Sequence, residues 1–100
     1  MRPVARAVGR LLRGLGIETE VARVEAIDRW ETVAVDVFGP DGALTRAVAV
    51  DTATLVVAVP TSAWASEIRL RQTDLLDRLS RSAPSSGITA IRTIPASRRW

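Results

Sequence analysis

Four arginines near the start of the chain have the spacing that most plainly suggests binding chemistry. They recur every three or four positions with no acidic residue among them: Arg2, Arg6, Arg10 and Arg13. A helix, which turns about 100° per residue, would place all four on one face. Arginine pairs with phosphate through two parallel hydrogen bonds, so this face predicts non-specific contacts with a nucleic-acid backbone. A solvated helix face that keeps the protein soluble accounts for the same spacing.

Further candidates follow Pro60, in a segment whose periodicity predicts a helix. Arg69 and Arg71 add positive charge there and complete the candidate set for nucleic acid. Trp64 could anchor a partner protein, because tryptophan is enriched among interface hot spots. It also shares the apolar stripe of the helix, which favours a place in the core. Leu70 projects among charged residues instead and is a candidate for partner contact, although single exposed leucines are ordinary.

Acidic residues are concentrated in the middle of the chain. Residues 18–51 have a net charge of −5, whereas residues 1–17 and residues 52–100 each have a net charge of +4. This distribution predicts a polarised surface, with one face for phosphate and another for a basic partner. Asp28 and Glu31, with Asp36, are the candidates for the acidic face. Plain exposure to solvent is the alternative interpretation of these residues.

The sequence lacks the residue types and motifs that common catalytic and metal sites require. The chain has no histidine and no cysteine, which excludes disulfides and thiol catalysis and removes the commonest zinc ligands. No glycine-rich loop is followed by Lys-Ser or Lys-Thr, so no phosphate-binding ATPase loop is expected. No serine has a histidine or lysine that could act as its base. We therefore expect no enzyme activity, no cofactor, no metal and no small-molecule substrate.

Two helices are expected to carry the N-terminal arginines and the acidic residues Asp28 and Glu31. Residues 3–15 have an amphipathic pattern that ends at two glycines and carries the four arginines opposite its apolar stripe. A second helix should run from about Glu18 to Val37, because apolar residues recur about every three positions. The sequence Gly39-Pro40-Asp41-Gly42 then predicts a turn.

Two strands should follow this turn, and a third should come last. Thr45–Val50 and Thr54–Val59 are rich in β-branched residues, and the short link between them suits an antiparallel hairpin. That link, Asp51-Thr52-Ala53, lacks the glycine that a tight primed turn prefers, so a tight turn is not expected. Ile88–Ile94 is expected to form the last strand, after a flexible loop.

The clearest element is a third helix after Pro60, with Thr61 or Ser62 as its N-cap. Its apolar residues keep helical spacing to about Arg81, where the helix should end. Three acid-before-base pairs lie four positions apart, and each is worth roughly 0.2–0.5 kcal/mol. The pairs are Glu67–Arg71, Asp74–Arg78 and Asp77–Arg81.

Together these elements predict an α+β fold with the order α-α-β-β-α-β. We expect a three-stranded, mostly antiparallel sheet with helices packed on one face, which is the element order of KH-like domains. Residues 1–96 should form a single domain and residues 97–100 a short basic tail. At 100 residues and 47% hydrophobic content, the chain is large enough to bury one core.

No membrane segment or signal peptide is expected. The apolar runs are far shorter than the ~20 residues that a membrane span needs. The start, Met1-Arg2-Pro3, lacks the continuous apolar region of a signal peptide. We therefore expect a cytoplasmic protein with no membrane partner.

One segment resembles the signature of a known family. Residues 58–70 read as a strand ending in valine, two small hydroxyl residues, Ala-Trp-Ala around Trp64, an acidic residue and a Leu-Arg-Leu-type run. This pattern is similar to that of the DciA family. Further stretches that fit the family are Val8-Gly9-Arg10-Leu11-Leu12, Trp30, Thr45-Arg46-Ala47-Val48 and Leu75-Leu76-Asp77-Arg78-Leu79. The resemblance therefore spans nearly the whole chain.

The resemblance implies a role in bacterial DNA replication. DciA-family members are similar to KH domains in fold, associate with the DnaB-type replicative helicase, help to load it and bind DNA. This chain is therefore expected to bind that helicase and single-stranded DNA, while the helicase hydrolyses ATP. The stretch from Trp30 to Thr45 is longer than in the family pattern, so we expect the end of the second helix to be remodelled.

Two other functions fit the same residues. One is an RNA-binding KH-like protein without helicase contact, and the other is a protein–protein adaptor whose arginines only confer solubility. Gly39-Pro40-Asp41-Gly42 formally matches the Gly-X-X-Gly loop with which KH domains clamp nucleic acid. It precedes a strand, however, and does not join two helices, and its aspartate would repel phosphate. A plain turn is the expected structure.

Overall fold

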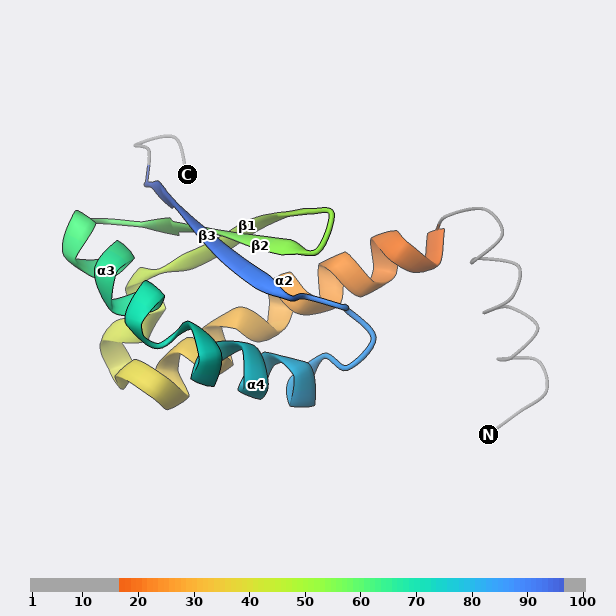
Figure 1. The fold of residues 1–100 in the computed structure, drawn as a ribbon, viewed down its shortest axis with the longest axis horizontal. Helices are drawn as coiled ribbons and strands as arrows, with labels where there is room; N and C mark the ends of the chain where they lie inside the picture. The colour runs from red at the N-terminus through yellow and green to blue at the C-terminus, as the bar shows by residue number, and fades with distance from the viewer. Residues whose placement is uncertain (1–16, 97–100) are drawn as a thin grey trace.

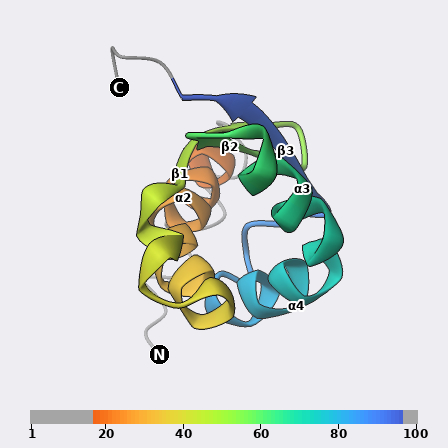
Figure 2. The ribbon, with the colours of Figure 1, turned by 90° about the vertical axis from the view of Figure 1, so that its left-hand side faces the viewer.

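Three helices lie on the same side of a three-stranded sheet in the part of the chain that the structure describes (Figures 1 and 2). The structure is a computed structural model and describes residues 17–96. Its elements, in chain order, are α2 (Ile17–Phe38), the 3-10 helix η1 (Pro40–Leu44), β1 (Arg46–Asp51), β2 (Thr54–Val59), α3 (Ser62–Leu70), α4 (Gln72–Ser82) and β3 (Ala90–Pro95). The α+β class is confirmed. The helix expected over residues 3–15 and the tail at 97–100 lie outside the described residues.

The sheet is mixed, which corrects the prediction of a mostly antiparallel sheet. β1 pairs with β2 in the antiparallel direction, whereas β2 pairs with β3 in parallel. The cause is the connection between β2 and β3, because α3 and α4 carry the chain back along the sheet before β3 begins. Thr54 at the start of β2 therefore pairs with Ala90 at the start of β3. A helical crossover of this kind is what parallel neighbours require.

The hairpin between β1 and β2 is tighter than the sequence suggested. Asp51 pairs with Thr54, so the loop contains only Thr52 and Ala53. Thr52 has a φ of 58°, a left-handed conformation that glycine adopts most easily in such loops. The prediction against a tight turn was wrong because a threonine supplies the conformation that glycine usually provides. β1 is also irregular, with a bulge between Ala47 and Ala49.

The core lies between the sheet and the three helices. Its largest fully buried side chains come from both layers: Trp30, Val33, Leu55, Val57, Ile68, Leu75 and Leu79. The central strand, β2, is buried from Leu55 to Val59, as expected for a strand with neighbours on both sides and helices against one face. Burial of each large apolar side chain stabilises the fold by roughly 1.5–3 kcal/mol. This core fixes the helices on which the candidate residues lie.

The predicted third helix is broken in two. α3 ends at Leu70 and α4 begins at Gln72, with Arg71 between them at φ −107° and ψ 15°. The expectation of one helix as far as Arg81 was wrong, although no glycine or proline marks the break. A tertiary contact accompanies it, because the side-chain Oε1 of Gln72 accepts a hydrogen bond from the backbone N–H of Ile91 (3.1 Å). The three predicted ion pairs nevertheless form: Glu67–Arg71, Asp74–Arg78 and Asp77–Arg81.

Candidate partner-binding surfaces

A chain of buried hydrogen bonds joins α2 to the start of β1. The indole Nε1 of Trp30 donates to the hydroxyl of Thr45 (3.0 Å), and that hydroxyl donates to the carbonyl oxygen of Gly42 (2.7 Å). Trp30 is 1% exposed and Thr45 is 3% exposed. Buried polar groups are costly when they lack partners, so these two bonds fix the position of η1 and β1 against α2.

Gly42 lets η1 approach α2 closely. A Cβ atom at this position would lie 2.4 Å from the carbonyl oxygen of Ala34 in α2, so only glycine fits without movement of the backbone. Gly39, by contrast, has a φ of 81° and open space around it. Gly42 therefore permits close packing against α2, and Gly39 supplies the turn geometry. The expectation of a structural turn, and not a nucleic-acid clamp, agrees with this arrangement.

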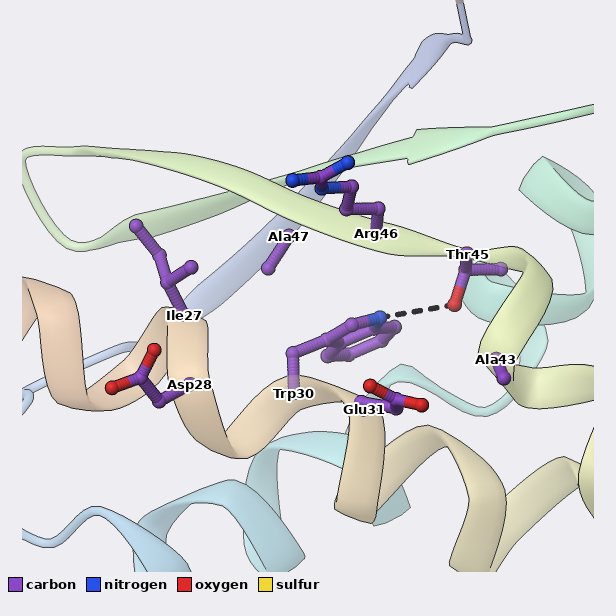
Figure 3. Close-up of a pocket in the computed structure, with 8 residues that line it drawn as sticks. All are labelled: Ile27, Asp28, Trp30, Glu31, Ala43, Thr45, Arg46 and Ala47. Atoms are coloured by element: carbon purple, nitrogen blue, oxygen red, sulfur yellow. Dashed lines mark hydrogen bonds between the residues drawn. The ribbon is translucent and has the colours of Figure 1, made fainter. Parts of the chain in front are cut away.

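A groove of about 400 Å³ lies beside this hydrogen-bonded floor (Figure 3). The residues that line it come from α2, η1 and the start of β1: Ile27, Asp28, Trp30, Glu31, Ala43, Thr45, Arg46 and Ala47. Asp28 and Glu31 are exposed and lie one turn apart along α2. The structure thus brings Asp28 and Glu31 to one wall of a groove, which the sequence alone did not indicate, whereas Asp36 does not line it.

The opposite wall of the groove belongs to β1. Ala47 points from β1 toward Trp30, whereas the side chain of Arg46 lies on the other side of the strand (Figure 3). Arg46 reaches the rim of the groove, but the two carboxylates on α2 outnumber it. The groove therefore combines a partly apolar floor with an excess of negative charge.

A second surface forms where the end of α2 meets α3. Phe38 and Trp64 pack edge to face, with ring centroids 5.2 Å apart and an interplanar angle of 83°. The guanidinium carbon of Arg71 lies 5.8 Å from the centre of the Phe38 ring, within the range of a cation–π contact. Trp64 is only partly buried and packs against the edge of the core. Trp64 therefore packs against the core, as its place on the apolar stripe predicted, and its role as a partner anchor stays a prediction.

A shallow hollow of about 230 Å³ opens beside this aromatic pair. It is lined by Phe38, Asp41, Thr61, Ala63, Trp64 and Glu67. The side chain of Thr61 accepts a hydrogen bond from the backbone N–H of Trp64 (3.3 Å), as an N-cap does at the start of a helix. This confirms Thr61 as the cap of the helix and holds the backbone at Trp64 in place.

Leu70 is the most exposed large apolar side chain that the described residues contain, at 79%. It stands at the last residue of α3, one position before the break at Arg71. The prediction that Leu70 projects from the charged side of the helix, away from the apolar stripe, agrees with this exposure. We call Phe38, Trp64 and Leu70 the aromatic corner: Phe38 and Trp64 are in contact, and Leu70 lies six positions after Trp64, at the last residue of α3.

The acidic groove and the aromatic corner are separate surfaces. The residues that line the groove and those that line the hollow have no member in common. Asp28 and Phe38 lie ten positions apart on α2, which corresponds to about 15 Å of helix. The four residues expected to bind a partner therefore divide into two pairs: Asp28 with Glu31, and Trp64 with Leu70.

The predicted nucleic-acid residues are only partly placed by the structure. Arg69 and Arg71 are exposed near the end of α3. Arg71 lies 3.8 Å from Glu67 and over the ring of Phe38, so part of its interaction capacity is used within the protein. The other four, Arg2, Arg6, Arg10 and Arg13, lie outside the described residues.

Two residues of these surfaces were missed by sequence reasoning. Thr45 was treated only as the start of a strand, although a buried Trp30 would have required some acceptor for its indole N–H. Phe38 gave no signal, because its contact with Trp64 joins positions 26 residues apart. Within residues 17–96, no group of three or more acidic side chains could hold a metal ion, and no helix could span a membrane.

Comparison with known families decides which protein family this is. The family model described as "Dna[CI] antecedent, DciA" matches residues 3–93. The chain belongs to the DciA family. The match includes the elements that form both surfaces, from α2 to α4. DciA membership supports a role as an accessory protein of DNA replication related to helicase loading. No curated protein matches the chain.

Proposed function

We propose that this DciA-family protein binds the DnaB-type replicative helicase and single-stranded DNA in the bacterial cytoplasm, and so promotes helicase loading. It carries out this role by binding and is not an enzyme. The observation that carries the proposal is Leu70, which is 79% exposed at the last residue of α3, the helix whose first turn carries the half-buried Trp64. Exposed apolar groups gathered beside aromatic rings are typical of protein interaction sites.

The aromatic corner is suited to partner binding because it is already ordered. Trp64 is held by the cap at Thr61 and by the ring of Phe38, so little conformational freedom remains to be lost on binding. Leu70 would enter an apolar pocket of the helicase, and full burial of such a side chain is worth roughly 1.5–3 kcal/mol. We therefore assign Leu70 as the anchor and Trp64 as its support.

Most of the residues that would bind DNA lie in another part of the chain, although Arg69 and Arg71 flank Leu70. The candidate arginines outside the described residues, together with Arg69 and Arg71, would contact phosphates without reading the bases. The acidic residues Asp28 and Glu31 would face a basic part of a partner and repel DNA from that side. The acidic groove would therefore face a protein partner, while the arginines face the DNA strand.

The RNA-binding KH-like alternative is less well supported. α3 and α4 are consecutive helices, and a KH clamp would occupy their junction. That junction is the single residue Arg71, without the glycines of a Gly-X-X-Gly loop. A backbone clamp of that kind would therefore have no loop to form it.

Size-exclusion chromatography with the helicase of the same organism tests the proposal. The wild-type protein should co-elute with the helicase, and Leu70→Ser should abolish or strongly reduce co-elution. Val21→Ser is the matched control, because Val21 is also exposed, at 56%, but lies in the first part of α2 and lines neither the groove nor the hollow. Equal co-elution of both variants would remove the aromatic corner from the interface, and failure of the wild-type protein to co-elute would overturn helicase binding.

Loading can be measured separately with a labelled single strand of ~20 nucleotides, longer than the site of one small domain. The wild-type protein should increase the amount of helicase on the strand. Leu70→Ser should bind the strand as well as wild type but fail to increase loading. Loss of strand binding in Leu70→Ser would show that the two faces are not separate.

A further inference from the structure

The groove between α2 and β1 lies along an open edge of the sheet. The strand order is β1-β2-β3, so β1 has β2 as its neighbour on one side. All the residues that line the groove come from α2, η1 and the start of β1, and none comes from β2. The groove is therefore on the unpaired side of β1, with α2 as its far wall; Figure 3 shows the residues that line it.

An edge strand of this kind can pair with another extended chain. Every second residue of an edge strand presents its backbone N–H and C=O groups outward, where they can form a ladder with a new strand. No strand within residues 17–96 pairs with the outer side of β1. The groove of about 400 Å³ would take the side chains that such a strand directs toward α2, because alternate side chains point to the same face.

The chemistry of the groove favours a basic occupant. The floor offers apolar contacts at Ile27 and Ala47, and the α2 wall presents the carboxylates of Asp28 and Glu31. A lysine or arginine side chain matches this arrangement, because its methylene stem covers apolar surface while its charge reaches the acidic rim. An acidic segment would instead place its carboxylates against those of α2.

We infer that this groove binds an extended, basic segment of a partner protein, which adds a fourth strand to the open edge of β1. The inference deepens the proposed partner-binding function by naming the conformation and charge of the segment that is recognised. The site is separate from the aromatic corner, so the two contacts can act together on one partner. The bulge between Ala47 and Ala49 interrupts the edge, so the added ladder is short.

The indole N–H of Trp30 provides a direct reporter for this site. It lies at the floor of the groove, bonded to Thr45, and the chain has three tryptophans, so three indole signals are expected in a nitrogen–hydrogen NMR spectrum. The variants Trp30→Phe and Trp64→Phe identify the signals of Trp30 and Trp64, because each variant lacks one of the three signals. The probe is a capped seven-residue peptide, Thr-Arg-Val-Arg-Val-Arg-Thr. Its addition to the full chain should move the Trp30 signal and β1 amide signals but leave the Trp64 signal unchanged.

Two matched comparisons separate strand addition from general charge attraction. The double variant Asp28→Asn/Glu31→Gln should bind the peptide at least about fivefold more weakly, whereas Asp36→Asn, on the same helix but outside the groove, should bind it as wild type does. A peptide N-methylated at alternate residues keeps its charge but cannot form the ladder, and it should not move the Trp30 signal. Full retention of binding in either case would overturn the inference.

The chain's own arginines are the competing occupant. Replacing Arg2, Arg6, Arg10 and Arg13 with serine should leave the Trp30 signal of the free protein unchanged. If this variant alone moves that signal and binds the peptide more tightly, the groove is filled by the protein's own segment and the partner inference is overturned. No helicase is present in these titrations, so their failure would leave the proposal for Leu70 intact.

Discussion

The indole of Trp30 shows how one polar atom fixes local structure. Its single donor is buried, and the hydroxyl of Thr45 accepts its hydrogen bond while donating onward to Gly42. A hydroxyl can do both at once, whereas an apolar side chain of the same shape can do neither. The floor of the acidic groove therefore depends on the oxygen of Thr45.

Thr45→Val should destabilise the protein by about 2 kcal/mol, because it leaves the buried indole N–H without its acceptor. Urea unfolding followed by tryptophan fluorescence measures this change. Thr45→Ser is the control, since it keeps the hydroxyl and should lose much less stability. A Thr45→Val variant as stable as the serine variant would contradict the role given to the hydroxyl.

Gly42→Ala and Gly39→Ala should both destabilise the protein, for different physical reasons. The new Cβ at position 42 would meet the Ala34 carbonyl oxygen at 2.4 Å, and the backbone shift that relieves this should cost at least about 2 kcal/mol. At position 39 the space is open, but φ 81° and ψ −167° lie in a region essentially restricted to glycine, so alanine should cost roughly 1–3 kcal/mol. Thermal unfolding measures both losses, and a Gly42→Ala variant as stable as wild type would show that packing at Gly42 is loose.

At the level of elements, helical periodicity was sufficient to locate the segment from Ser62 to Ser82 but not its break. Ile68, Leu75 and Leu79 are all buried, so their spacing reads as one continuous stripe. Beside the break, Gln72 accepts a hydrogen bond from the backbone of Ile91 in β3. Contacts between distant segments of this kind leave no local sequence signal.

Gln72→Leu should destabilise the protein by about 1 kcal/mol by removing the acceptor for the Ile91 N–H. The side-chain size is nearly preserved, so packing changes little. Hydrogen exchange gives the specific readout, because the Ile91 amide should exchange faster in this variant than in wild type. Gln72→Glu retains an oxygen acceptor and should keep that amide protected; equal exchange in both variants would show that the contact adds nothing.

The strand direction was the other feature that periodicity could not supply. The pattern of β-branched residues located all three strands, but antiparallel and parallel pairs use the same residues. The direction follows from the crossover through α3 and α4. The tight hairpin was missed for a different reason, because Thr52 takes a φ of 58° that composition would assign to glycine.

Across the whole molecule, charge segregation predicted which functions to consider but not where the surfaces would be. Asp28 and Glu31 were identified as an acidic pair, and the fold converts them into one wall of a groove. Trp64 and Leu70 were identified as partner residues, and the fold adds Phe38 to them. The groove and the corner arise only when α2 meets β1 and α3, which no local pattern describes.

Binding of a single strand should depend steeply on salt if the N-terminal arginines contact phosphates. The double variant Arg6→Glu/Arg10→Glu should abolish binding of an oligonucleotide at low salt while the far-ultraviolet circular dichroism remains that of wild type. The wild-type affinity should fall steeply as salt rises, because each phosphate contact releases a counterion. Unchanged affinity in the variant would remove this arginine face from the DNA-binding role.

The parallel pairing of β2 with β3 also governs how the protein is made. Leu55 and Ile91 are partners across this pair, and 36 positions of chain separate them. On the ribosome, the β1–β2 hairpin and the helices α3 and α4 are synthesised before β3. Until β3 is synthesised, the edge of β2 that pairs with it remains unpaired. Contacts this distant in sequence slow folding, and exposed strand edges promote aggregation. During synthesis, the nascent chain is therefore most vulnerable between the appearance of β2 and the arrival of residues 90–95.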